Sequence, residues 1–278
     1  MSAEDIDATK APLIEHLMEL RTRLIWSLVA LGACALVCFV FAEEIYDILT
    51  GPLRTRMEAR GQDPMLIYTQ LYEKFFVHLK IGLFGGVFIA FPIIAAQVWK
   101  FVAPGLYRDE QQAFLPFLAA TPILFLMGTF LVYFGVMPLA IDFFLDFQAA
   151  GGEGSTRIEF LGKVNEYLSL VMTFILAFGI CFQLPVLLLL LVRAGIASAE
   201  GLAEKRKYAI VGIAAAAALL TPPDPISQLG LGIPIYLLYE VSIHLARLVE
   251  KRRAQREAEA DAQFERDLDE LGFDKDDD

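Results

Sequence analysis

Six apolar stretches separated by short polar connectors occupy most of this chain: Leu24–Phe41, Phe75–Val98, Phe114–Met137, Tyr167–Val192, Tyr208–Leu220 and Ile226–Ala246. The hydrocarbon core of a bilayer is roughly 30 Å thick, so a spanning helix needs about 20 residues at about 1.5 Å each. The first four stretches meet that length, and the last two are marginal. The pattern therefore predicts an all-α polytopic membrane protein with six transmembrane helices.

Apolar positions follow a helical period ahead of the first stretch as well. Leu13, Leu17, Leu20 and Leu24 fall within about 60° of one another on a helix, and polar residues such as Glu19 lie opposite. We therefore expect an amphipathic helix that lies on the membrane face and runs into the first span.

Prolines interrupt four of the later stretches, at Pro92, at Pro116 with Pro122, at Pro185 and at Pro234. In lipid such prolines bend helices and free carbonyls that need partners within the protein. Kinked helices of this kind predict a concave wall.

The connector between the last two stretches, Thr221–Pro225, is long enough only for a tight hairpin. Tyr208–Leu220 has 13 residues, which corresponds to roughly 20 Å of helix, so this hairpin falls short of a full bilayer. Local membrane thinning or a helix of another protein would relieve the mismatch.

We divide the chain into a cytoplasmic amphipathic segment (1–23), a six-helix membrane domain (24–246) and an acidic cytoplasmic tail (247–278). Residues 254–278 carry 11 acidic and 3 basic side chains, most of the net charge of −11. With so little apolar surface, the tail is expected to be largely disordered. A basic footprint for nucleic acid is absent from the sequence.

Basic residues are distributed unequally between the two sets of connectors. The set that includes both termini holds 16 Lys and Arg residues, against 4 in the other set. The positive-inside rule then places both termini in the cytoplasm. No cleavable signal peptide is evident, so the first stretch is expected to be retained as a span.

Two polar positions within the apolar stretches need partners. Gln183 would leave about four hydrogen-bonding sites unmet in lipid. It either forms hydrogen bonds between helices or belongs to a functional polar site. Glu240 lies one turn before His244 and two turns before Arg247, and contacts with these two residues suffice to explain it.

Glu19 and Glu110 are the carboxylates with a candidate role, because both lie on the predicted cytoplasmic face. Structural explanations exist for each: Glu19 can pair with Arg23 at i+4, and Glu110 suits the first turn of a helix. Two carboxylates on one face could instead grip guanidinium groups bidentately.

Catalytic and metal chemistry find little support in the sequence. The three cysteines all fall in apolar stretches and are typical of small buried hydrophobic residues. With three histidines and no metal-ligand spacing, we expect no metal and no cofactor. The spans also lack the residue set of an intramembrane protease, so we expect no enzyme.

Five motifs, in order, resemble those of the TatC family, the polytopic receptor of the twin-arginine protein translocase. The first is Ile14–Leu24 (IEHLMELRTRL), and the others are Phe101–Glu110 (FVAPGLYRDE), Tyr133–Ala140 (YFGVMPLA), Phe178–Val186 (FGICFQLPV) and Leu220–Asp224 (LTPPD). The match covers about Leu13 to Arg247.

The resemblance implies a function that composition alone could not. It implies a subunit of the bacterial inner membrane that binds twin-arginine signal peptides of folded precursors and recruits single-span TatA- and TatB-type partners. Transport would be driven by the proton-motive force, and the receptor complex would contain several copies of the chain. The alternative is a polytopic small-solute transporter, which predicts inverted repeats that the sequence does not display.

The resemblance also assigns residues. Glu19 and Glu110, with Arg21 and Phe101 beside them, match the family's signal-peptide positions. The other matches are to a proline of the first external loop, an aspartate of the external hairpin and two polar positions for partner helices: Pro52, Asp224, Thr221 and Gln228. Ala218 replaces a methionine found in some relatives. Gln183 stands where relatives often have glutamate, so a proton-coupled role is not expected there.

Overall fold

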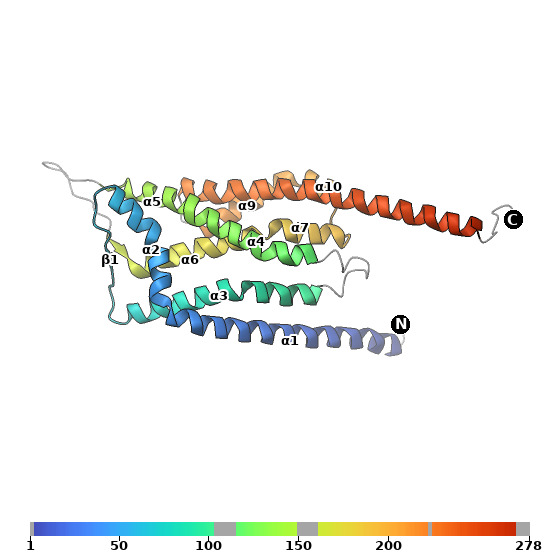
Figure 1. Cartoon of the computed structure of the whole chain (residues 1–278), viewed down its shortest axis with the longest axis horizontal. Helices are drawn as coiled ribbons and strands as arrows, with labels where there is room; N and C mark the ends of the chain where they lie inside the picture. The colour runs from blue at the N-terminus through green and yellow to red at the C-terminus, as the bar shows by residue number, and fades with distance from the viewer. Residues whose placement is uncertain (1–2, 103–114, 149–160, 222–223, 271–278) are drawn as a thin grey trace. The chain divides into compact units, whose positions relative to one another are not determined.

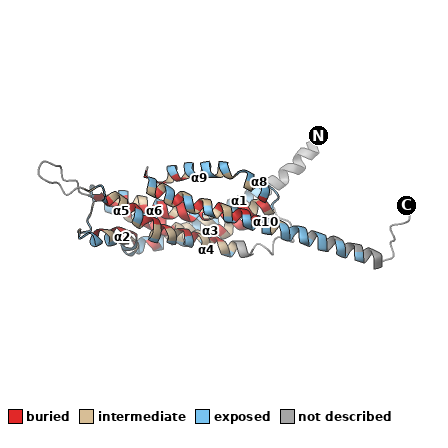
Figure 2. Ribbon diagram, turned by 90° about the horizontal axis from the view of Figure 1, so that it is seen from above, coloured by how far each residue is buried: buried red, intermediate tan, exposed pale blue. Residues whose placement is uncertain are grey.

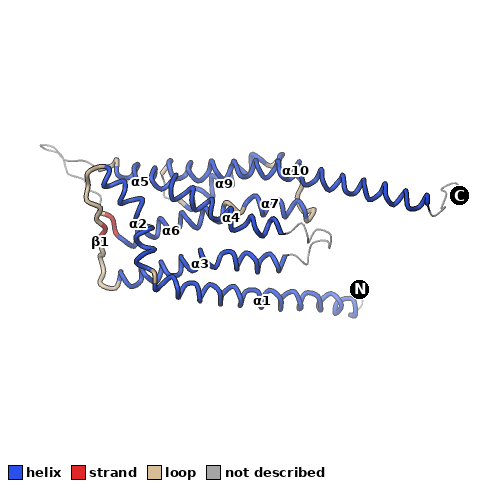
Figure 3. Tube along the Cα trace, viewed as in Figure 1, coloured by secondary structure: helices blue, strands red, loops and turns tan. Residues whose placement is uncertain are grey.

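The computed structural model describes residues 3–102, 115–148, 161–221 and 224–270 of the chain. Two compact units are described separately. Unit 1 comprises Met1–Gln183 with Ala217–Leu231, and unit 2 comprises Leu184–Ala216 with Gly232–Asp278. Almost all described residues are helical (Figure 3), which confirms the predicted all-α class.

The elements follow one another as a series of helices with two very short strands (Figure 1). Those of unit 1 are α1 (Ala3–Val40), α2 (Ala42–Ala59), β1 (Leu66–Ile67), α3 (Glu73–Val102), α4 (Leu115–Leu131), the π-helical turn η4 (Val132–Val136), α5 (Met137–Leu145), β2 (Gly162–Lys163) and α6 (Val164–Cys181). Then come α7 (Leu184–Arg193), α8 (Ala199–Glu204), α9 (Arg206–Leu220) and α10 (Pro225–Glu270).

Five segments of the described residues are long and apolar enough to cross a membrane: His16–Val40, Glu73–Phe101, Leu118–Leu145, Val164–Arg193 and Pro225–Arg256. They correspond to five of the six predicted stretches. The remaining stretch forms α9, whose 15 residues span only about 22 Å. A sixth span and the cytoplasmic placement of both termini remain predictions.

Small residues allow α1 and α3 to lie side by side (Figure 1). A Cβ atom at Gly86 of α3 would lie 2.6 Å from the Cα atom of Ala35 in α1, closer than side chains tolerate. Close backbone approach of this kind is typical of helix pairs in membranes, where packing replaces the hydrophobic effect.

Helix α6 is the most enclosed part of unit 1 (Figure 2). Ten of its 18 residues are buried. Phe125 of α4 packs so closely on Gly179 of α6 that a side chain there would overlap its ring. On the other side of the contact, a Cβ atom at Gly128 would lie 2.7 Å from the carbonyl oxygen of Phe178.

Pro52, which the resemblance matches to a proline of the first external loop, lies inside α2. Proline has no N–H, and the carbonyl of Ile48 therefore loses its helical donor. The hydroxyl of Tyr133, in η4, donates to this oxygen at 2.6 Å. Gly51 leaves room for it, since a Cβ atom there would lie 2.9 Å from the hydroxyl.

The next carbonyl of α2 also accepts a hydrogen bond from a tyrosine. The hydroxyl of Tyr167, in α6, donates to the oxygen of Leu49 at 3.1 Å. Two tyrosines from different segments thus hold α2 against the membrane helices of unit 1.

A short parallel strand pair, which the sequence pattern did not predict, joins two distant connectors (Figure 3). Leu66 pairs with Gly162 and Ile67 with Lys163. Glu73 stabilises this junction from the first turn of α3. Its carboxylate accepts the backbone N–H of Thr69 at 2.6 Å and that of Asn165, at the start of α6, at 3.4 Å.

Proline has different effects along the chain. Helices α3, α4 and α10 continue through Pro92, Pro122 and Pro234. The predicted interruption is present before Pro185, where α6 ends at Cys181 and α7 begins at Leu184. Proline is well suited to the first turn of α7, where its missing N–H has no helical partner anyway.

Unit 2 contains α7, α8 and the first part of α9. These segments pack against the part of α10 that belongs to this unit. Its core includes Leu188, Tyr239 and Ile243. Gly195, with φ of +71°, ends α7; its N–H donates to Val192 O and the following N–H to Leu191 O, the bonding of a Schellman motif.

Helix α10 continues to Glu270, so the described part of the tail is helical where we expected disorder. Residues 247–270 are rich in Ala, Glu and Arg, which are strong helix formers. They also extend an existing helix, so no new nucleation is required.

The bond between Tyr133 and Ile48 can be tested by a double-mutant cycle with Pro52. Tyr133→Phe should lower the free energy of unfolding in detergent by about 1 kcal/mol, the usual size of a hydrogen bond within a membrane protein. In a Pro52→Ala background the cost should shrink, because Ala supplies the missing N–H. Tyr72→Phe is the control, since its side chain is 59% exposed. Equal costs in both backgrounds would contradict this explanation of Pro52.

Candidate functional site

One end of the α1–α3 pair gathers polar and aromatic side chains, including Glu19. Its carboxylate Oε1 accepts a hydrogen bond from Arg23 Nη2 at 2.8 Å. Arg23 Nη1 reaches Gln97 Oε1 of α3 at 3.4 Å. One turn further along each helix, the rings of His16 and Phe101 stack with centroids 4.3 Å apart.

This arrangement brings together two of the four predicted signal-peptide residues, Glu19 and Phe101. Arg21 is exposed and, two residues after Glu19, lies about 200° away around α1. Glu110 lies outside the described residues, so its distance from Glu19 is untested. Gln97 and the stacked His16 were missed because only the packing of α3 on α1 brings them here.

The environment of Glu19 suits guanidinium binding. The carboxylate is only 31% exposed and is already bonded to an arginine. A carboxylate offers two oxygens to the five N–H donors of a guanidinium group, and such charge-assisted bonds are among the strongest in proteins.

Gln183 has direct structural partners. Its own N–H bonds Ile180 O at the interruption after α6, which leaves the carbonyl of Gly179 without its helical donor. The side-chain Nε2 replaces that donor at 3.4 Å and also bonds Thr121 O of α4 at 3.0 Å. Nearby, Trp99 Nε1 donates to the Thr121 hydroxyl at 3.2 Å. Gln183 thus joins helices, and a further functional role for it stays a prediction.

The turn between α9 and α10 contains the predicted docking residues. The hydroxyl of Thr221 donates to Ala217 O at 2.9 Å, within its own helix. Gln228 is half-buried in the first turns of α10, and Ala218 is exposed. Asp224 precedes α10 and is 4% exposed.

Glu240, in unit 2, has partners other than those predicted. Its carboxylate accepts bonds from Arg206 Nε at 2.7 Å, Arg206 Nη2 at 3.0 Å and the Tyr236 hydroxyl at 2.9 Å. Arg206 opens α9 and comes from far along the sequence, so spacing within one helix could not reveal it. The bidentate pair accounts for Glu240 as a structural residue.

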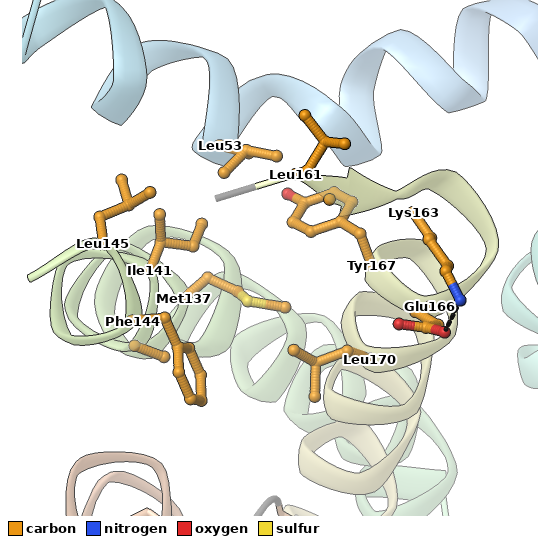
Figure 4. A pocket seen from close by; sticks show the side chains of 12 residues that line it. Leu53, Met137, Ile141, Phe144, Leu145, Leu161, Lys163, Glu166, Tyr167 and Leu170 are labelled. Atoms are coloured by element: carbon orange, nitrogen blue, oxygen red, sulfur yellow. Dashed lines mark ion pairs between the residues drawn. The ribbon is translucent and has the colours of Figure 1, made fainter. Parts of the chain in front are cut away.

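An apolar cavity of about 270 Å³ lies between α2, α5 and α6 (Figure 4). Met137 and Ile141 line it from α5, and Leu170 from α6. The charged pair Lys163–Glu166, 3.3 Å apart, stands at one side. The lining contains no set of convergent polar groups that would indicate catalysis.

Acidic clusters elsewhere are explained by ion pairs. Asp142 of α5 and Asp146, which follows it, bind Arg60 at the C-terminal end of α2 at 3.3 and 2.8 Å, and these ion pairs link the two helices. Within the described part of the chain, no group of three or more His, Cys, Asp or Glu side chains is placed to hold a metal ion.

Comparison with known proteins adds the family. The sequence profile of TatC, described as Sec-independent protein translocase protein (TatC), matches residues 15–234. The TatC protein of Magnetococcus marinus is 50% identical over 258 residues, 93% of this chain and 92% of that protein. That of Escherichia coli is 37% identical over 257 residues, 92% of this chain and 95% of that protein.

A solved structure agrees with these relatives. The crystal structure of a twin-arginine translocase receptor, TatC, superposes with a TM-score of 0.72 at 37% identity, over 84% of this chain and 98% of that one. The likeness therefore extends from sequence to fold and covers nearly the whole of the relatives. On these grounds the chain belongs to the TatC family of Sec-independent protein translocase proteins.

Proposed function

We propose that the chain is the receptor and core subunit of a twin-arginine export system. It binds the twin-arginine signal peptides of folded precursors and recruits single-span TatA- and TatB-type subunits for translocation driven by the proton-motive force. Family membership and the solved relative named as a twin-arginine translocase receptor support this function over a small-solute transporter. The chain is a multi-pass protein of the bacterial inner membrane and not an enzyme.

The observation that carries the proposal is the guanidinium bound to Glu19. Arg23 Nη2 donates to Glu19 Oε1 at 2.8 Å, and Gln97 Oε1 is a second acceptor for the guanidinium group of Arg23. A peptide arginine that approaches Glu19 competes with this internal arginine. It gains a carboxylate held at the end of a rigid helix pair, which reduces the entropy lost on binding.

The other assigned residues complete the peptide site in this proposal. Glu110 supplies the second carboxylate, so that each of the two peptide arginines has an acidic partner. Phe101, stacked on His16, offers an aromatic face to the adjoining peptide segment. Arg21, which the resemblance also assigns to peptide binding, is exposed on another face of α1. Several copies of the chain assemble in the receptor complex.

Partner helices dock at the α9–α10 hairpin in this proposal. Helix α9 is largely exposed (Figure 2) and too short for a bilayer, so a neighbouring span would cover it and relieve the mismatch. Gln228 provides a polar contact for that span. Thr221, whose hydroxyl proton is used within its helix, remains an acceptor.

Removing either carboxylate should weaken peptide binding. Glu19→Gln and Glu110→Gln should each cost about 1.5–3 kcal/mol, or roughly ten-fold or more in affinity for a twin-arginine peptide. Binding is measured by titration of the purified chain in detergent. Glu58→Gln, an exposed carboxylate of α2, is the matched control. Unchanged affinity in the Glu19→Gln, Glu110→Gln double mutant would rule out these residues as the peptide site.

Peptide arginines should not be replaceable by lysine. Lysine keeps the charge but lacks the planar fork that binds a carboxylate through two parallel bonds. A Lys-Lys peptide should therefore bind more weakly than an Arg-Arg peptide at the same salt concentration. Equal affinities, with the same salt dependence, would indicate simple electrostatic attraction.

Cysteines placed along Ile210–Leu220 or Leu229–Leu237 should cross-link to a single-span partner in a chain without its three native cysteines. Thr221→Val with Gln228→Leu should weaken that contact by about 1–2 kcal/mol through lost interhelical bonds. Cross-links confined to α1 or α4 would place the docking surface elsewhere.

A further inference from the structure

The apolar cavity between α2, α5 and α6 can be reached from the surface (Figure 4). Three residues of its lining extend outward: Leu161 is 57% exposed, and the side chains of Lys163 and Glu166 are 46% and 71% exposed. Deeper in the lining, Leu53 and Met137 are buried. A ligand can therefore enter past the charged pair and come to rest on apolar side chains.

The cavity extends from the end of two membrane-spanning segments into their apolar part. The segment Leu118–Leu145 ends, and Val164–Arg193 begins, at the same end of unit 1 (Figure 1). Met137 lies eight residues before the first of these ends, and Leu170 lies six residues after the second. At about 1.5 Å per residue, both positions are roughly 9–12 Å deep along their helices. Lys163 directly precedes the second segment, so charged groups stand at the membrane interface and apolar groups below it.

The size and polarity of the cavity suit an acyl chain. Its volume is about 270 Å³, and an engineered apolar cavity of about 150 Å³ stays dry but binds benzene. An apolar occupant is therefore favoured over water, and a chain longer than benzene has room. A lipid chain would leave one apolar medium for another, so its affinity comes from packing contacts and from the headgroup.

The two charges at the entrance indicate which headgroup fits. Lys163 Nζ lies 3.3 Å from Glu166 Oε1 in an exposed pair, and such pairs exchange partners at little cost. The backbone of Lys163 is held in β2, which pairs with β1. Phosphatidylethanolamine has a phosphate that accepts from Lys163 and an ammonium group that donates to Glu166. Phosphatidylglycerol lacks the ammonium group and would place its phosphate beside an unpaired carboxylate.

We infer that this cavity binds one phospholipid with a zwitterionic ethanolamine headgroup. One acyl chain lies between Met137 and Leu170, and the headgroup bonds Lys163 and Glu166. The lipid contacts α2, α5 and α6 together. This site is separate from the proposed peptide site and does not depend on it.

Native mass spectrometry of the purified full chain, with both lipids added at equal concentration, tests the headgroup. One phosphatidylethanolamine should be retained roughly two- to five-fold better than phosphatidylglycerol, the usual worth of one exposed ion pair. Glu166→Gln should remove this preference, and Lys163→Gln should weaken retention of both lipids. Glu58→Gln, exposed on α2 and outside the lining, is the control. Equal retention of the two lipids by the unaltered chain would overturn the inference.

Ala140→Leu tests the place of the acyl chain, because Ala140 lines the cavity and the change adds three carbons there. Retention of phosphatidylethanolamine should fall at least about five-fold, since chain and side chain would overlap. Thermal stability of the delipidated chain should be unchanged or raised, because empty space is filled. Ala214→Leu, exposed on α9, should change neither quantity. A fall in the stability of the delipidated chain would mean that the lining already fills this space, and would overturn the inference.

Leu170→Trp is a second variant, at a half-buried position of the same lining. Unchanged retention in both Ala140→Leu and Leu170→Trp would place the lipid elsewhere and overturn the inference. A protein occupant is tested with Leu170→Cys in a chain without its native cysteines. Cross-linking of this cysteine to a single-span partner, with no phosphatidylethanolamine retained by the complex, would make the cavity a protein contact instead.

Discussion

Every backbone N–H and C=O within the membrane must be bonded inside the protein, because lipid offers no partners. At two places where a backbone carbonyl lacks its helical donor, a side chain supplies one. The Tyr133 hydroxyl bonds Ile48 O, which Pro52 leaves without a donor. The amide of Gln183 bonds Gly179 O at the break between α6 and α7. These bonds also join segments of unit 1, because Tyr133 connects η4 to α2 and Gln183 bonds Thr121 O of α4.

That constraint separates structural polar groups from those available for binding. Glu240 is fully engaged by Arg206 and Tyr236, and Gln183 bridges to α4. Glu19 forms a partly exposed ion pair with Arg23. Asp224 has one buried oxygen without a hydrogen-bond donor from the described residues. Among the described carboxylates, Glu19 is therefore the one to which the proposed function assigns a peptide arginine.

Hydropathy predicted the helical class and the positions of the long spans, because the bilayer fixes the length and apolar character of any helix that crosses it. Motif order predicted the family. Local rules failed where distant residues decide the structure. Pro52, matched to an external loop, lies within a helix in which Tyr133 supplies the missing donor, and the partner of Glu240 is Arg206 from another helix. Spacing could suggest the Glu19–Arg23 pair, but not the contact of Arg23 with Gln97 or the pairing of His16 with Phe101.

The central claim is that the end of α1 near Glu19 binds the arginines of a signal peptide. A photoreactive residue placed beside the two arginines of a precursor's signal peptide, followed by mass-spectrometric mapping of the adducts, tests it most directly. The account predicts adducts between His16 and Arg23 and in the connector of residues 103–114, with loss of these adducts when both peptide arginines are replaced. Adducts found mainly on α7, α8 or the part of α10 in unit 2 would contradict it.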